Sequence, residues 1–402
     1  MKLRNLIAAA LLFSAFSPFA GAEDMNTRIY GYINGYWEDV DDQPTLTNTG
    51  ADATSKNPSE FQVPNVHLIV QSKMDQFKTY LNVYGTESDA LVVNNAWVES
   101  DLHGDYLKFR IGKLYRPFGL YNEILDAVPT YIGIEPPELF DGDHLMLTRT
   151  TNAMLHGRAE MGPGFLNYAL TTGNDERESS QTPYGMDVNY TIDTRWKIGS
   201  SYYNSGGYAK SLASIGTSGK SGSFGAVLPW MSEDKFSVFG GYLQYRDDHW
   251  TFQVATYAAS HDATRDSAAV TSICSNAKMS TASRARFGCG GTINTNGDYD
   301  VKTSYTRLGY TFITERGNLT PYAQFDMYEN KETVLDKSWG GDNEAGLADD
   351  GKFSKATLGL FYQPTYAVAL KSDYSQHLQK VNGRDQNYGE VRFSFSYFWR
   401  LQ

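Results

Sequence analysis

Residues 390–399 read EVRFSFSYFW, and this stretch decides the fold. Apolar and aromatic side chains stand at every second position from Val391 to Trp399. The positions between them begin with polar residues: Glu390, Arg392, Ser394 and Ser396. Because successive side chains of a β-strand point to opposite faces, one face of this segment suits lipid and the other suits water. The stretch therefore predicts a strand of a membrane-spanning β-barrel.

The same two-residue period recurs along the chain, for example at 107–111, 186–192 and 307–312. Seven short, turn-forming connections separate such segments: 74–76, 102–105, 162–164, 193–194, 247–249, 315–318 and 363–365. Eight mostly longer, polar connections alternate with them: 39–63, 86–90, 114–150, 174–183, 205–234, 260–302, 329–352 and 377–386. Fifteen connections join sixteen strands.

Short periplasmic turns, longer outer loops and an even strand count are typical of bacterial outer-membrane barrels. A soluble β-sandwich explains any single alternating segment, but its loops have no reason to alternate in length through the whole chain. We therefore expect an all-β fold, a transmembrane antiparallel up-and-down β-barrel of about sixteen strands. Both termini are expected on the periplasmic side of the outer membrane of a Gram-negative bacterium.

The first 22 residues have the parts of a secretory signal peptide: Lys2 and Arg4, an apolar stretch from Leu6 to Phe19, and small residues up to Ala22. Its removal moves the formal net charge from -11 to -13 and leaves residues 23–402 for the barrel. The remainder has no apolar run near the ~20 residues that a spanning helix needs. With 28 Tyr, 21 Phe and 37 Gly, the full chain is aromatic and glycine-rich without being hydrophobic, as a barrel with one wet face requires.

The connection from 114 to 150 follows the fifth predicted strand, and it is rich in apolar and proline residues. A solvent-facing loop has no use for so many apolar side chains. We therefore expect this loop to fold inward against the barrel wall as a constriction, since a barrel of sixteen strands is too wide for its own side chains to fill.

The segment Gly112 to Glu123, GKLYRPFGLYNE, resembles a stretch found in bacterial porins of the phosphate-selective O/P superfamily. The resemblance covers about a dozen residues. It implies that the loop after the fifth strand constricts the pore, and that the protein forms a homotrimer. The family owes its anion selectivity to Arg and Lys at the narrowing, whereas this loop is mostly acidic, which departs from that pattern.

The expected pore-lining and constriction residues combine this loop with the neighbouring wall: Lys108, Arg110, Lys113, Arg116, Glu123, Asp126, Glu135, Glu138, Asp141, Asp143, Arg149 and Arg158. Acids on the loop opposite bases on the wall would set a transverse field, and acids at the narrowest point favour cations or no strong selectivity. The alternative interpretation is that these charges pair with one another and keep the lumen wet.

Cys274 and Cys289 lie close together in a polar segment, so in an exported protein we expect them to form a disulfide; two free thiols are the alternative. The seven histidines show no metal-ligand spacing on one strand, and we expect no metal and no cofactor.

These features predict a porin for passive diffusion of ions and small hydrophilic solutes, in contact with outer-membrane lipid and without a nucleic-acid partner. A phosphate- or anion-selective porin remains an alternative, as does a sheath or receptor barrel around a partner protein. An outer-membrane hydrolase is not expected: no G-x-S-x-G segment is present, and the candidate base His156 falls on a predicted inward face.

Overall fold

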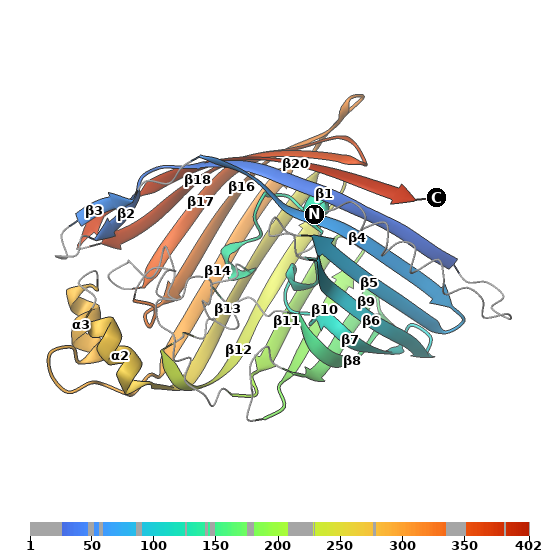
Figure 1. Ribbon diagram of the computed structural model, residues 1–402. Helices are drawn as coiled ribbons and strands as arrows, with labels where there is room; N and C mark the ends of the chain where they lie inside the picture. Colours follow the sequence, from blue (N-terminus) through green and yellow to red (C-terminus); the bar gives the residue numbers. More distant parts are fainter. Residues whose placement is uncertain are drawn as a thin grey trace.

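In a computed structural model, the described residues are 26–46, 52–55, 59–85, 91–124, 127–140, 144, 149–174, 181–207, 228, 230–275, 279–334, 351–381 and 383–401. They form one large sheet of tilted antiparallel strands that closes on itself (Figure 1). The expected signal peptide, residues 1–22, lies outside the described residues. Among the described residues, no helix is long and apolar enough to cross a membrane.

The sheet contains sixteen long strands: β1 (Asn26–Val40), β4 (Glu60–Met74), β5 (Phe77–Gly85), β6 (Leu91–His103), β7 (Leu107–Tyr115), β8 (Arg149–Met161), β9 (Gly164–Gly173), β10 (Tyr184–Ile192), β11 (Trp196–Asn204), β12 (Met231–Arg246), β13 (Trp250–Arg265), β14 (Tyr299–Tyr310), β16 (Gly317–Asn330), β17 (Lys352–Thr365), β18 (Val368–Val381) and β20 (Tyr388–Leu401). Two short strands extend it, β15 (Phe312–Thr314) after β14 and β19 (Arg384–Asp385) beside the end of β18. The predicted barrel of about sixteen strands is confirmed.

The barrel closes between its first and last strands, which lie side by side in Figure 1 as the blue and red ribbons. The pairing of β1 with β20 runs from Ile29↔Leu401 to Val40↔Glu390, and the other side of β1 pairs with β4. Closure matters because an open edge in lipid would leave backbone N–H and C=O groups without partners.

The alternation along β20 separates a wet face from a lipid face as its sequence predicts. Phe393, Phe395 and Tyr397 point outward and are about half exposed, whereas Ser394 and Ser396 are buried on the inner side. The inner serines donate hydrogen bonds to Asn34 Oδ1 of β1, at 3.1 and 2.8 Å. The inner wall is therefore polar and internally hydrogen-bonded, as an aqueous lumen requires.

Seven short turns join the strands at one end of the barrel, here called the turn end; the opposite end is called the loop end. Six lie at or within a residue or two of their predicted positions, but residues 363–365, predicted as the seventh turn, belong to β17, and the turn to β18 is at 366–367. The turns contain the left-handed residues Asp75 (φ 53°) and Asp193 (φ 49°), both of a type that tolerates this conformation. Gly317 (φ 114°) is required in its turn, because a Cβ there would lie 2.2 Å from the carbonyl oxygen of Gln363.

Two of the long connections contain structure that the sequence did not predict. Residues between β1 and β4 form a separate hairpin, β2 (Gln43–Leu46) and β3 (Asp52–Ser55). The segment 260–302, expected to be a polar loop, instead contains helices α2 (Ser267–Cys274) and α3 (Thr281–Phe287). Asp266 and Ser280 cap these helices by accepting from the backbone N–H groups of Ala269 and Ser283.

The disulfide between Cys274 and Cys289 is confirmed, with the two Cα atoms 5.3 Å apart. It joins the end of α2 to the residues that follow α3. Ile273 of α2 and Phe287 of α3 are fully buried in one apolar cluster with Trp230. The loop is thus a small helical unit with its own apolar contacts at the loop end of the barrel (Figure 1).

Candidate pore constriction

The connection between β7, the fifth long strand, and β8 lies inside the barrel. It contains three short 3-10 turns, η1 (Asn122–Ile124), η2 (Val128–Thr130) and η3 (Glu138–Phe140). The N–H of Gly119 donates to Ser201 Oγ of β11 at 2.9 Å. Further along, the N–H of Ile134 donates to Asp373 Oδ2 of β18 at 2.9 Å. The segment, here called the inner loop, therefore crosses the lumen and is attached to inward-facing side chains of distant strands.

Apolar packing explains the unusual composition of the inner loop. The ring of Phe118 lies 4.7 Å from that of Tyr257 on β13, and Tyr121 contacts Tyr305 on β14 at 6.0 Å. Leu139 and Phe140 are also fully buried against this wall. Aromatic contacts of this kind contribute about 0.5–1.5 kcal/mol each beyond area burial, so the loop has a defined seat on one side of the lumen.

Buried cations of the wall hold the loop through its backbone carbonyls. Lys371 of β18 donates to Val128 O at 2.6 Å and to Gly133 O at 2.7 Å. Arg307 of β14 donates to Ile132 O at 2.6 Å. Because charge-assisted hydrogen bonds are stronger than neutral ones, these contacts fix the path of η2 and the residues after it.

Two of the loop acids are paired with bases of the same wall. Lys355 of β17 binds Glu135 at 3.0 Å and also contacts Glu138, and Arg392 of β20 contacts Glu135. Burial alone would raise the pKa of the Glu135 carboxyl, but Arg392 and Lys355 outweigh burial and hold it at about 2. The pKa of the Glu138 carboxyl is likewise held well below its usual range, because Lys355 and His144 outweigh the effect of burial. Both acids are thus neutralised locally.

The opposite side of the lumen is open. A hollow of about 410 Å³ lies between the inner loop and the wall from β5 to β10. Its charged and titratable lining groups are Lys78, Glu99, Asp105, Lys108, Arg110, Glu123, His156, Arg158 and Asp187. Among the described residues, this hollow separates the inner loop from the wall opposite its seat, and it is here called the passage.

Within the passage most carboxylates already have partners. Glu99 contacts Arg110 through its Oε2 atom, at 2.5 Å, and His156 at 3.0 Å. Asp105 lies 2.8 Å from Lys108. Asp187 accepts from Ser201 at 2.7 Å and from Tyr242 at 2.9 Å.

The structure brings only some of the predicted pore residues to the passage. Four of them line the passage: Lys108, Arg110, Glu123 and Arg158. Glu135, a residue of the inner loop, faces the opposite wall. Asp126, Asp141 and Asp143 lie outside the described residues, and only the backbone of Arg149 is described, where it pairs with Tyr115.

Three of the predicted residues have other positions. Lys113 belongs to the outward set of β7, with Phe109 and Ile111, and donates to Val93 O at 2.8 Å. The odd-even alternation of that strand already separates it from Lys108 and Arg110.

Arg116 is 1% exposed at the base of the loop, where it donates to Asn174 O at 2.7 Å and lies over the ring of Tyr203. The Glu138 side chain is buried between the loop and the wall, where it contacts Lys355. Both were expected at the pore because of their charge, but they anchor the loop instead.

A cation–aromatic cluster beside the passage was missed from the sequence. Trp97 of β6 lies 4.1 Å from the Arg110 guanidinium and stacks on Tyr80 of β5 at 5.2 Å. The two-residue period places Trp97 on the same inward face as Glu99, so the signal was present. Over the described part of the chain, no group of three His, Cys, Asp or Glu side chains is placed to hold a metal ion.

Whole-chain comparison with solved structures finds outer-membrane channels of the same architecture. An anion-selective porin from Comamonas acidovorans superposes with a TM-score of 0.56 at 11% identity, covering 94% of this chain and 100% of that chain. The outer-membrane channel DcaP of Acinetobacter baumannii gives a TM-score of 0.52 at 9% identity, covering 96% and 99%. The trimer form of OmpT, an outer-membrane protein of Vibrio cholerae, gives 0.54 at 12% identity, covering 94% and 100%.

No family model matches the chain, and no curated protein matches it. At these identities the solved structures show that the chain has the fold of outer-membrane channel barrels. What passes through this barrel has to be argued from its own side chains.

Proposed function

We propose that this protein is a porin of the outer membrane, a water-filled channel for passive diffusion of ions and small hydrophilic solutes. The observation that carries the proposal is the one-sided seat of the inner loop. The loop is bound to β11, β13, β14, β17, β18 and β20, and it leaves a polar hollow against β5 to β10. A loop that narrows the lumen without filling it is what a size-limited diffusion channel needs.

A weak preference for anions is part of this proposal. The sequence alone favoured cations or no strong selectivity, because acids outnumber bases on the loop. In the described residues, however, Glu135 and Glu138 are paired on the far wall. Lys78 and Arg158 of the near wall have no carboxylate within ion-pair distance among the described residues, and the loop acid Glu123 and Asp187 of β10 face the same passage. The passage itself is lined by four bases and four acids, and Arg28 and Lys73 against Asp101 at its turn end give the open side an excess of one base.

Two other classes of function fit the site less well. A sheath around a partner protein needs a wide lumen, and the inner loop occupies much of this one. In an outer-membrane hydrolase, His156 would be the base, but it faces the passage and is held by Glu99 at 3.0 Å. We therefore propose that the protein transports solutes without catalysing a reaction.

The test is deletion of residues 124–143 with single-channel recording in a planar bilayer. Removal of η2, η3 and their contacts should raise conductance roughly severalfold, because a sixteen-strand barrel without its loop keeps a wide bore. The control is deletion of 43–55, the β2–β3 hairpin, which pairs only with itself and should leave conductance unchanged. Unchanged conductance in the 124–143 variant, or an absence of channels in the intact protein, would contradict the proposal.

A further inference from the structure

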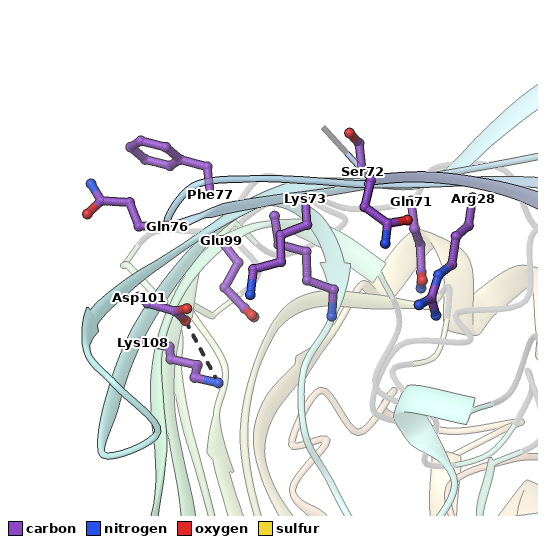
Figure 2. Close-up of a pocket in the computed structure, with 11 residues that line it drawn as sticks. Arg28, Gln71, Ser72, Lys73, Gln76, Phe77, Glu99, Asp101 and Lys108 are labelled. Atoms are coloured by element: carbon purple, nitrogen blue, oxygen red, sulfur yellow. Dashed lines mark ion pairs between the residues drawn. The ribbon is translucent and has the colours of Figure 1, made fainter. Parts of the chain in front are cut away.

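A second hollow lies at the turn end of the lumen, where the passage opens past the constriction. It has a volume of about 380 Å³ and shares Lys78, Glu99 and Lys108 with the passage. Figure 2 shows Arg28, Gln71, Lys73 and Lys108 on the inner side of the strands, whereas Phe77 projects from the other side. Because short turns of outer-membrane barrels face the periplasm, this hollow is the periplasmic mouth of the channel.

Three cations define this mouth, and together they are called the mouth cluster: Arg28 of β1, Lys73 of β4 and Lys78 of β5. The register pairs Lys73 directly with Lys78 across the β4–β5 hairpin, and both belong to the inward set of their strands. Side chains directly opposite in an antiparallel pair have Cβ atoms roughly 5 Å apart, and like charges there are destabilising. Arg28 stands one strand away, opposite Gln71.

The carboxylates of the hollow are occupied by other bases. Glu99 is bound by Arg110 and His156. Asp101 lies 3.8 Å from Lys108, which also binds Asp105. Among the described residues, no acid lies within ion-pair distance of any member of the mouth cluster. Lys78 has one other favourable contact, with the Trp97 ring at 5.5 Å.

We propose that the mouth cluster is a binding site for a small dianion. This inference rests on the proposed channel function, because the dianion reaches the site through the lumen. Two facing ammonium groups repel each other unless negative charge lies between them, and a neighbouring guanidinium adds a third positive group. A monoanion neutralises one of these charges, whereas a dianion of one compact body can contact both lysines at once. The site makes flux of dianions saturable, and it lies at one end of the pore.

Blocking of single-channel chloride current by sulfate tests the site, with nitrate as the monoanion control at equal ionic strength. Sulfate should reduce the current at a lower concentration when it is added on one side of the bilayer than on the other, because the cluster lies at one mouth. Nitrate should show no such difference. In the double variant Lys73→Gln/Lys78→Gln the half-blocking sulfate concentration should rise roughly tenfold, since each exposed ion pair contributes modestly.

The matched control is Lys302→Gln/Lys331→Gln. It removes two positive charges that line another hollow, at the loop end of β14 and β16. It should keep the wild-type block. Both double variants should still form open channels in potassium chloride, whatever the size of the conductance, which shows that the barrel has formed. Equal sulfate block from both sides, or equal block in the mouth variant and the wild type, would overturn the dianion site and leave the channel proposal standing. A wild-type protein without conductance would overturn the channel itself.

Discussion

At the scale of single residues, a charge on a pore loop has no fixed meaning for permeation. Glu135 and Glu123 are both loop acids, yet one is bound by Lys355 and Arg392 and the other faces the open passage. An acid paired with two bases at short range presents little net field to a passing ion. A count of loop acids therefore overstates the electrostatic attraction that the loop exerts on cations, and the partner of each acid has to be known.

Substitution Lys355→Met should release the inner loop from the far wall. The variant removes the lysine partner of the buried Glu138 carboxylate and leaves the His144 imidazole beside it, and breaking a buried pair in this way costs about 3–5 kcal/mol of unfolding free energy. Denaturant unfolding in lipid vesicles measures the loss. Lys352→Met, on the same strand but about half exposed, should change stability by less than about 0.5 kcal/mol. Similar stability in both variants would show that Lys355 does not hold the loop.

At the scale of elements, the two largest connections use different means to become ordered. In its described residues the inner loop has no long helix, and contacts with the wall side chains Tyr257, Lys371 and Lys355 hold its shape. The segment 266–298 instead has capped helices, an apolar interior and a disulfide. A buried bidentate pair, Arg265 with Glu332, ties its base to the end of β16.

Reduction of the Cys274–Cys289 bond should loosen the helical segment without changing the pore. The bond spans 15 residues, and closure of a loop of that length stabilises it by about 3 kcal/mol in the chain-entropy description. Hydrogen exchange over residues 267–289 should accelerate on reduction, while single-channel conductance persists, because the passage lies against β5 to β10. A non-reduced digest analysed by mass spectrometry should contain the two cysteine peptides joined. Recovery of both thiols free would refute the pairing.

At the scale of the whole molecule, the inner loop divides the lumen of the barrel into two different sides. One side, from β11 to β20, is filled by the inner loop and neutralised by short ion pairs. The other side, lined by β1 and by β4 to β10, has the passage and the mouth cluster, whose bases Arg28, Lys73, Lys78 and Arg158 have no carboxylate within ion-pair distance among the described residues. Ion preference is a property of this arrangement, since the field in the open side is set by charges that have no local partner.

The expected sign of ion preference follows from that division. A reversal potential measured across a potassium chloride gradient should have the sign of a modest anion preference, and Lys78→Gln/Arg158→Gln should shift it toward zero. The shift should shrink at high salt, because the screening length falls from about 10 Å at 0.1 M to about 3 Å at 1 M. A clear cation preference in the intact protein would contradict the assignment and restore the loop acids as the controlling charges.

The architecture follows from local patterns in the sequence. Strand periodicity, turn chemistry and the alternation of short and long connections are local properties, so residues 390–399 and the turns near Asp75 and Gly317 could be interpreted without knowing their neighbours. For the same reason the barrel of sixteen strands, the position of the inner loop after the fifth strand and the Cys274–Cys289 disulfide were all predicted. The helices α2 and α3 were missed, because their short amphipathic segments lie in a run of Ser, Thr and Gly that resembles a loop.

Only the tertiary structure decided which charges meet. Glu135 reaches Lys355 across 220 residues and Arg392 across a still longer separation, and no local pattern encodes such a pairing. Arg116 and Glu138 carry charges that suit a pore, yet closure of the barrel buries them as anchors. The lumen is shaped by which wall the loop rests on, and that choice depends on contacts between segments that are distant in sequence and adjacent once the sheet has closed.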